Sequence, residues 1–354
     1  MSHRFLAATL TVAAATWLTP AVVAGQTSRP SASSRPSGSS TKVPRMPDGR
    51  PDLQGVWTMA TFTPLQRPPN LAGKEFFTEE EAENLARLLT ADGVDPLAGG
   101  VLTAETEEQR EARAKQTKEN IHYDNAIWLR ENTPKGLSSR RTSLILEPSD
   151  GRIPALTPAA QQREAERRKA AQSGAFDSYE TRPLQERCVV WTHEGPPMIP
   201  PPYNDRMQIF QTPDYVAINP EVRTNPVRMI PLNNRPHPSS MLRQWAGNSS
   251  GHWEGDTLVV ETVNYNDKVR FQGSSSALHV VERFTRIDVE TIRYEFTVED
   301  PTVWTKPWRA EIPLMKADGL LYEYGCHEGN HDIANILEIT RNVEAAGGAK
   351  KPSK

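Results

Sequence analysis

The stretch LHVVERFTRIDVETIRYEFTVED, residues 278–300, decides the fold class of this chain. Apolar and polar residues alternate in both of its halves, which is the two-residue period of a half-buried β-strand. Asp288-Val289-Glu290 separates the halves and predicts the turn of a hairpin. A loop with an odd number of residues places Arg283 opposite Glu295 and Phe284 opposite Tyr294. An even-length loop would mix the two faces, so we expect the odd one.

This register gives the hairpin one apolar face, which we expect to point inward. Glu282 falls on that face, where a carboxylate is costly unless it is paired or faces a wet cavity. The polar face carries His279, Arg283, Thr285, Arg293, Glu295 and Thr297. The apolar face carries Leu278, Val280, Phe284, Ile292, Tyr294, Phe296 and Val298.

Other segments after residue 185 show the same alternation and short turns. Strands are predicted within residues 206–221, 227–232, 251–266, 308–315 and 319–326. Trp308, Ala310, Ile312 and Leu314 share one face, and Leu320, Tyr322, Tyr324 and Cys326 share another. Strands that recur with no helix between them predict an antiparallel meander. A meander this long is expected to close into a lipocalin-like barrel, because open sheet edges aggregate.

The first half of the chain is mainly helical in pattern. Thr78 with Glu81 predicts a capping box, and Thr106 with Gln109 predicts another. Thr157-Pro158 opens a charged helix that is expected to stop before Gly174. A strand at 53–59 and a hairpin over 141–156, turning at 148–151, interrupt these helices. We therefore expect a mainly β fold with a helical cover inserted at about 75–180.

The ends of the sequence predict export. A basic start, an apolar run and small residues indicate a signal peptide over 1–24, rather than the alternative of an N-terminal membrane anchor. Residues 25–46 are rich in Ser and Pro and predict a disordered linker. A single domain is then expected over 47–341, with a loose tail over 342–354. The net charge of −3 gives no signal for nucleic acid or for an anionic membrane surface.

Cys188 and Cys326 are the two cysteines of the sequence. In an exported protein an even number suggests a disulfide, and the alternative is two separate buried thiols. The bond would fix residues 327–331 against residues 186–191.

Residues 327–331 read His-Glu-Gly-Asn-His. On a helix this string would place His327, His331 and Glu338 on one face as zinc ligands, with Glu328 as general base. Gly329 and Asn330 are poor helix residues, however, and the string follows a predicted strand. The alternative is a turn at Gly329-Asn330 with a helix from Asp332.

Three other motifs suggest barrel features. Gly55-x-Trp57 near the first strand is similar to lipocalin-like barrels, in which the indole plugs the closed end. Arg235 and His237 lie in a Pro-rich loop and would bind an anionic group or form surface ion pairs. Trp304 and Trp308 belong to an aromatic lid or to a packed crossover. The sequence has no Gly-rich phosphate loop, no G-x-S-x-G motif and no CxxC pair.

Several blocks together resemble a family of exported bacterial proteins found in many copies in some soil-bacterial genomes. They are PDLQGVW, RTSLILEPSDGRIPALTP, QTPDYVAI, RQWAGNSSGHWEGDTLVVET, YEFTVEDPTVWTKPW and YEYGCHEGN. The resemblance covers most of residues 50–337 and implies an exported β-rich domain, with no reaction assigned. The last block of the family does not require His331, which points to His327 and Glu328 as a unit.

We expect an exported protein that binds, and in one variant transforms, a small apolar or aromatic molecule inside its barrel. In the enzymatic variant the catalytic candidates are Glu282, His327 and Glu328, with Glu282 as the internal acid or base. The alternatives are a zinc hydrolase, which would be the one case with a cofactor, and a non-catalytic envelope protein. No nucleic acid and no stable membrane insertion are expected, and the oligomeric state stays open. The expected ligand-binding residues are Arg235, His237, Phe284, Tyr294, Trp304, Trp308, Tyr322 and Tyr324.

Overall fold

The computed structural model describes residues 42–89, 139–174, 176–191, 194–201, 204–222, 227–233, 235–322 and 324–346. The expected signal peptide, the helix that begins at Thr106, and most of the linker and of the tail lie outside these ranges.

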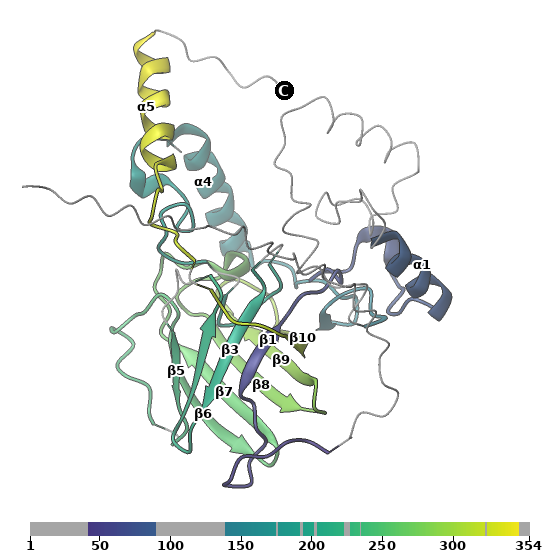
Figure 1. Ribbon diagram of the computed structural model, residues 1–354. Helices are drawn as coiled ribbons and strands as arrows, with labels where there is room; N and C mark the ends of the chain where they lie inside the picture. The colour runs from purple at the N-terminus through teal and green to yellow at the C-terminus, as the bar shows by residue number, and fades with distance from the viewer. Residues whose placement is uncertain are drawn as a thin grey trace, which may run out of the picture. The chain divides into compact units, whose positions relative to one another are not determined.

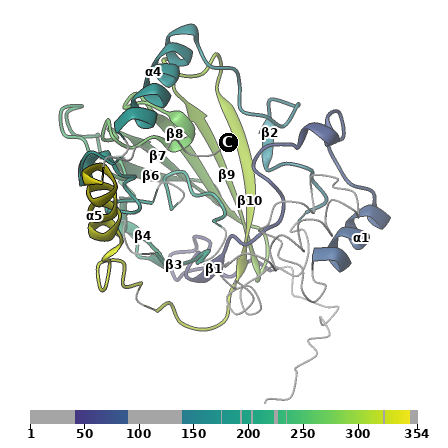
Figure 2. The same cartoon turned by 90° about the horizontal axis from the view of Figure 1, so that it is seen from above.

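Ten strands of the described chain form one antiparallel sheet that curves into a nearly closed barrel (Figures 1 and 2). The order is β5-β4-β3-β1-β10-β9-β8-β7-β6, and β2 pairs with β10 beside β1. The expected mainly β, barrel-like fold is therefore confirmed. The strands are β1 (Gly55–Thr58), β2 (Ile145–Glu147), β3 (Arg206–Gln211), β4 (Tyr215–Pro220), β5 (Arg228–Pro231), β6 (Asn248–Glu254), β7 (Thr257–Val263), β8 (His279–Arg286), β9 (Thr291–Glu299) and β10 (Trp308–Lys316).

The hairpin of β8 and β9 has the expected register. Arg283 pairs with Glu295 and Phe284 pairs with Tyr294. All seven apolar residues of the expected inner face are buried, and so is Glu282. The local alternation of residues therefore sets which face of the sheet points into the barrel.

The barrel closes between β5 and β6, the two ends of the strand order, through side chains. Ile230 and Leu232 pack on the backbone of Gly251, where an added Cβ would lie 2.9 Å from Cγ2 of Ile230. Arg228 of β5 donates from Nε to Oγ of Ser249 on β6 over 2.9 Å. Because Gly251 has no side chain, Ile230 and Leu232 can pack against β6, and Arg228 bonds across the same seam. These side-chain contacts join β5 and β6, which have no backbone ladder between them.

β10 lies between β9 on one side and two short strands on the other. β2 pairs with its start, at Arg309 and Ala310, and β1 pairs with its end, at Met315 and Lys316. Pro313 lies in the interval between them. Because proline has no backbone N–H, it is tolerated where only one neighbouring strand needs a donor.

Trp57, which the Gly55-x-Trp57 motif predicts as a plug at one end of the barrel, lies near the β8–β9 turn. Its side chain is fully buried, and Nε1 donates to the carbonyl oxygen of Leu53 over 3.0 Å. The guanidinium of Arg286 lies 5.1 Å from the ring centre and also bonds to the carbonyl oxygen of Asp52. This cation–π contact closes the end of the barrel that is formed by the β8–β9 turn.

Three α-helices lie in the described ranges. Residues Thr78 and Glu81 form the expected capping box at the start of α1 (Glu79–Leu89), with hydrogen bonds of 2.8 and 3.2 Å. Thr157 caps α4 (Pro158–Gly174) by accepting from the backbone N–H of Ala160. None of the described helices has the length and apolar content to cross a membrane. Short 3-10 turns are η1 (Pro69–Leu71), η3 (Tyr179–Thr181) and η4 (Phe271–Gly273).

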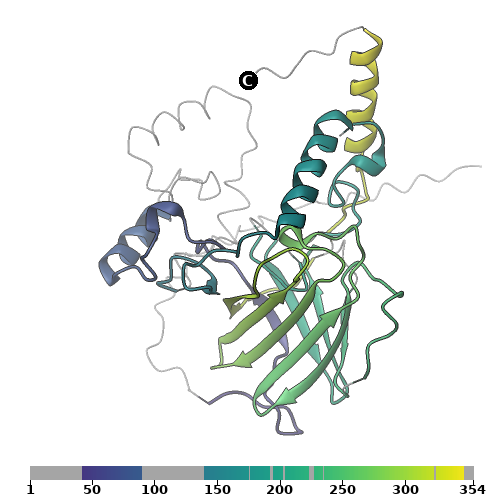
Figure 3. The same ribbon diagram turned by 180° about the vertical axis from the view of Figure 1, so that it is seen from behind.

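α4 and α5 (Asp332–Ala345) stand at the same end of the barrel (Figures 1 and 3). Arg341 of α5 donates to the carbonyl oxygens of Phe176 and Asp177, just after α4, over 2.9 and 2.6 Å. No residue of α5 is buried among those described. Ile333, Ile336 and Leu337 are half-buried, so partial apolar packing holds the helix in addition to these polar bonds and the chain that leads into it.

Two predicted β elements are wrong. The described residues of 319–326 form no strand, because the free side of β10 is already taken by β1 and β2. Residues 141–156 turn at Pro148–Gly151 but do not pair with each other. The first half forms β2 on β10, while Gly151 and Ile153 bond to Arg67 and Gln66. In both cases a strand distant in sequence takes the place of the local partner.

Candidate functional site

A polar cluster lies on the inner face of the barrel, at the seam between β5 and β6. We call it the inner polar cluster and define it as Arg228, Ser249, Thr262, Glu282 and Tyr294. Glu282 is 0 % exposed, and the other members are buried or nearly so. The cluster brings together side chains from β5, β6, β7, β8 and β9, so it forms only when the barrel closes.

Every contact in this cluster involves a charged or hydroxyl group. Arg228 binds Glu282 with two parallel bonds, one of 2.9 Å from Nη1 to Oε1 and one from Nη2 to Oε2. The hydroxyl of Tyr294 donates to Oε1 of Glu282 over 2.7 Å. Bidentate pairing of this kind is the strongest protein hydrogen bonding and offsets the cost of burying the two charges. The expectation that Glu282 is paired or faces a wet cavity is met by pairing.

Burial and the charge of Glu282 shift the pKa values of its neighbours. Burial by itself would lower the pKa of Arg228, but the facing carboxylate outweighs this effect and raises the pKa above its usual value. Burial raises the pKa of Tyr294 and of Tyr265 well above 10, and the negative charge of Glu282 adds to the rise. The arginine therefore stays charged and both tyrosines stay protonated as hydrogen-bond donors.

A segment at residues 194–198 reaches the interior and bonds to these tyrosines. The backbone N–H of Met198 donates to the hydroxyl of Tyr294 over 2.9 Å, and Tyr265 donates to the carbonyl oxygen of Pro196 over 3.0 Å. Met198 is fully buried in the barrel core. The hydroxyl of Tyr294, which we expected to face a ligand, therefore also holds this segment in place, together with the hydroxyl of Tyr265.

A second interior group consists of aromatic rings, and we call it the tryptophan cluster: Phe271, Phe296, Trp304 and Trp308. Trp308 has ring centres of the three others within 5.8 to 6.0 Å, stacked on Phe271 and edge-on to Phe296 and Trp304. Trp304 is 2 % and Trp308 is 1 % exposed. Neither Nε1 has a hydrogen-bond partner among the described residues. The cluster therefore holds two buried indole donors without an acceptor among the described residues, and Nε1 of Trp253 is a further such donor outside the cluster.

The remaining predicted ligand-binding aromatics divide into two groups. Phe284 and Tyr294 lie in the barrel interior with ring centres 4.8 Å apart. Tyr322 is 76 % exposed, because the chain leaves the sheet after β10 instead of forming the strand that would turn this residue inward. Tyr324 packs edge-on to Trp191 at 6.2 Å. The predicted inner tyrosines at 322 and 324 are therefore not part of the barrel wall.

Cys188 and Cys326 form the expected disulfide, with their Cα atoms 5.8 Å apart. Asn330 donates from Nδ2 to the carbonyl oxygen of Glu186 over 3.1 Å, which adds a second link beside the bond. His327 and Glu328 lie exposed in the turn between Cys326 and Asn330, and Glu328 lies against Gly325. No described contact joins these two residues to Glu282.

The helix required for the zinc site is absent. α5 begins at Asp332, with His331 just before it and the turn at Gly329-Asn330, so His327 and His331 do not lie on successive turns of a helix. Across the described ranges, no group of three or more His, Cys, Asp or Glu side chains is arranged to hold a metal ion. The prediction of a zinc site on His327, His331 and Glu338, with Glu328 as base, is therefore corrected. These residues belong to a turn and to the helix that follows it.

Arg235 and His237 lie in the loop before β6. Arg235 is exposed, and its carbonyl oxygen accepts from Oγ of Ser250 over 3.0 Å. His237 contacts Oδ1 of Asn248 through Nδ1 at 2.7 Å, and its Nε2 lies 3.6 Å from Glu261. These contacts correspond to the surface-pairing alternative for His237.

The comparisons with known proteins give no name to this site. No protein-family model, no curated protein and no solved structure matches the chain.

The sequence analysis did not indicate five residues of the site: Arg228, Ser249, Thr262, Tyr265 and Phe271. Arg228 stands in a strand of four residues, too short for its alternation to define an inner face. Its partner is 54 positions away. The sequence offered one indication of this pair. Arg228 is a basic residue within a predicted strand, and Glu282 is an inward-facing acid that must be paired.

Proposed function

We propose that this protein binds a small, largely apolar or aromatic molecule inside its barrel, against the tryptophan cluster. The observation that carries the proposal is the pair of buried indole N–H groups of Trp304 and Trp308, which have no acceptor among the described residues. An indole nitrogen donates and cannot accept, so only an acceptor satisfies it.

The energetic cost of the two donors supports a bound acceptor. A buried donor left without a partner costs about 1–3 kcal/mol. Adding one carbonyl or ether oxygen beside Trp304 and Trp308 would recover that cost, while Phe271 and Phe296, which pack on Trp308, make the surroundings apolar and aromatic. Most small-molecule sites combine such apolar walls with a few polar groups that fix orientation.

The inner polar cluster has a supporting role in this proposal. The carboxylate of Glu282 already accepts bonds from Arg228 and Tyr294, and its charge is offset by the guanidinium. We assign it to closing the barrel and fixing the tyrosine hydroxyls, and we assign ligand contact to the tryptophans.

Native mass spectrometry of the protein, purified without denaturation, tests the proposal first. The expected result is a species heavier than the chain by the mass of one small molecule. The second measurement is titration with prodan, an uncharged naphthalene with one carbonyl acceptor, followed by its fluorescence.

Replacing Trp304 or Trp308 with Phe keeps an aromatic ring and removes the donor. Each variant should bind prodan several-fold more weakly, because a neutral hydrogen bond contributes about 1 kcal/mol. Trp253→Phe is the matched control. Trp253 packs on the core at the end of β6 next to the β6–β7 turn, and it is not part of the tryptophan cluster. The proposal fails if the native mass is that of the chain alone and prodan does not bind, a result that would favour a non-catalytic envelope protein.

We also propose that the protein is exported. The disulfide uses every cysteine of the sequence, and such bonds persist in oxidising compartments. N-terminal sequencing of the protein from its natural cells tests this, with residue 25 expected first. A chain that starts at Met1 would contradict it.

A further inference from the structure

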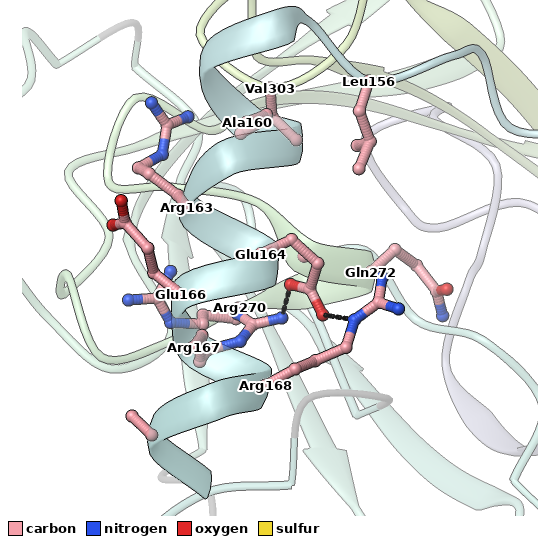
Figure 4. Close-up of a pocket in the computed structure, with 12 residues that line it drawn as sticks. Leu156, Ala160, Arg163, Glu164, Glu166, Arg167, Arg168, Arg270, Gln272 and Val303 are labelled. Carbon is pink, nitrogen blue, oxygen red and sulfur yellow. Dashed lines mark hydrogen bonds and ion pairs between the residues drawn. The ribbon is translucent and has the colours of Figure 1, made fainter.

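A groove outside the barrel runs along α4 and is separate from the tryptophan cluster. It lies between α4, the turn at η4 and the loop before β10, and has a volume of about 670 Å³ (Figure 4). Small-molecule sites commonly measure roughly 300–1,000 Å³, so the groove has the size for an organic ligand.

The lining of the groove is strongly basic. Four arginines, Arg163, Arg167, Arg168 and Arg270, face two glutamates, Glu164 and Glu166, which leaves an excess of two positive charges. The complete chain carries a net charge of −3, so this excess is local. A concave surface of one sign attracts ligands of the opposite charge.

Several donors of these arginines are not used by the protein. Arg167 and Arg168 both bind Glu164, but Arg168 does so through Nε over 3.2 Å and is 72 % exposed. Its two terminal nitrogens have no hydrogen bond to any described residue. Arg270 is exposed, and its guanidinium likewise has no hydrogen bond or ion pair within the described ranges. Figure 4 shows both guanidinium groups at the lower part of the groove.

The upper part of the groove is apolar. Leu156, Ala160 and Val303 line it, and Figure 4 places them together at the start of α4. Glu164 stands between this wall and the arginines. The groove therefore combines an apolar wall at one end with unpaired guanidinium donors at the other.

We propose that this groove is a second binding site, for a small organic anion with an apolar body, such as an aromatic or aliphatic carboxylate or sulfonate. The apolar body lies on Leu156, Ala160 and Val303. The anionic group binds Arg168 and Arg270, whose planar guanidinium groups match a carboxylate or sulfonate with two parallel bonds. This site goes beyond the proposed function, because its arginines lie on α4 and beside η4, outside the tryptophan cluster and the inner polar cluster, although Ala160 and Val303 also belong to the hydrophobic core.

The test uses 8-anilinonaphthalene-1-sulfonate, a fluorescent aromatic anion, with the full-length protein. Arg270→Gln should weaken its binding about tenfold, the effect of one lost charge-assisted hydrogen bond. Arg168→Gln should act in the same direction. Arg283→Gln is the matched control, because Arg283 is an exposed arginine on β8 and lines no part of the groove. Its affinity should equal that of the unmodified protein.

A variant of opposite sign makes the test sharper. Glu166 accepts one bond, from Nε2 of Gln162 over 3.0 Å, so Glu166→Gln removes a negative charge with little structural loss. It should tighten binding of the sulfonate by about two- to threefold. Prodan, which has no charge, should bind all four variants equally, so that a failed interior site and a failed groove give different results. The proposal is overturned if Arg270→Gln and Arg168→Gln bind the sulfonate as tightly as the unmodified protein, or if Arg283→Gln weakens it equally.

Discussion

At the scale of the residue, the pairing of Glu282 explains how an acid can occupy the inner face of a barrel. We predict that Glu282→Gln lowers the free energy of unfolding by about 3–5 kcal/mol, because it leaves the buried guanidinium of Arg228 without a counter-charge. Urea-induced unfolding measures the change.

Two comparisons test whether the loss of stability is specific to Glu282 or follows from replacing any glutamate. Glu299→Gln changes an exposed acid on β9 and should leave the unfolding midpoint as it is. Adding Arg228→Met to Glu282→Gln should recover part of the loss, because the double change removes both buried charges. A Glu282→Gln protein as stable as the original would mean that the pair contributes nothing.

Asp205 gives a pH-dependent prediction. It is buried beside β3, accepts from the hydroxyl of Thr58 over 2.7 Å, and burial raises its pKa from 3.8 to about 6. The folded chain therefore binds this proton more tightly than the unfolded chain. Ionised Asp205 reduces stability above about pH 6, and that cost disappears as the pH falls from about 6 to about 4.

Asp205→Asn removes the cost without removing the acceptor for Thr58. The variant should be more stable than the original protein by roughly 3 kcal/mol at most at pH 8, and no more stable at pH 4. Urea unfolding at the two pH values measures this, with Asp214→Asn in the β3–β4 turn as the exposed control. A gain that is equal at both pH values would show that ionisation is not its cause.

The sequence alone showed that the inward-facing carboxylate of Glu282 must be paired or face a wet cavity, but it did not show which residue pairs with it. The alternation within residues 278–300 places Glu282 inward because side-chain direction depends only on neighbouring residues. Which arginine reaches it depends on the order of the strands. The orphaned indoles of Trp304 and Trp308 were also hidden, since a sequence gives donors without the distances to acceptors.

At the scale of the element, strands were predictable wherever both partners are adjacent in sequence. β3 with β4, β6 with β7, and β8 with β9 are all hairpins, and each was expected. Residues 141–156 had an equally clear hairpin pattern, but β2, in the first half of this segment, pairs with β10 instead of with the second half. Residues 319–326 alternate well but found no free neighbour, which is why Tyr322 and Tyr324 were misplaced in the expected ligand-binding set.

The disulfide is the element that fixes the chain after β10. It joins residues 138 positions apart, and in the chain-entropy model a loop of this length stabilises by about 4–5 kcal/mol. We predict that the paired change Cys188→Ser and Cys326→Ser lowers the free energy of unfolding by up to this amount. Urea unfolding in the presence and absence of a reducing agent measures it.

The paired serine protein is also the control for the reducing agent, which should not affect it. Protection from proteolysis at residues 324–330 should fall in parallel, because the segment loses its covalent link to residue 188 while the side chain of Asn330 still donates to the carbonyl oxygen of Glu186. If the reducing agent leaves the original protein unchanged, the bond does not constrain this segment.

At the scale of the whole molecule, the barrel is the cooperative unit, and its closure is the part that sequence could not give. A meander pairs consecutive strands, but β5 and β6, although consecutive in sequence, form no backbone ladder and are the two ends of the strand order. Here β5 and β6 meet through Arg228 and through Ile230 and Leu232 on Gly251. The glycine is informative only once its opposing strand is known, because no positive φ or turn marks it.

α5 provides the test of what lies outside that unit. Among its described residues none is buried, and Ile339 and Val343 are largely exposed. Its polar links to the rest of the fold are the bonds of Arg341 to Phe176 and Asp177, and the chain that follows Cys326 leads into it. We predict that a chain ending at residue 330 keeps its free energy of unfolding within about 1 kcal/mol, because surface bonds contribute little.

The matched comparison is a chain ending at residue 307, which also loses β10. That chain should not fold, because β10 supplies Trp308, Ala310, Ile312 and Leu314 to the core and is the neighbour of β9, β1 and β2. Circular dichroism and urea unfolding distinguish the two truncations. If removing α5 destabilises the chain as much as breaking the disulfide does, α5 belongs to the cooperative unit, and the polar attachment seen between α4 and α5 contributes far more than exposed hydrogen bonds ordinarily do.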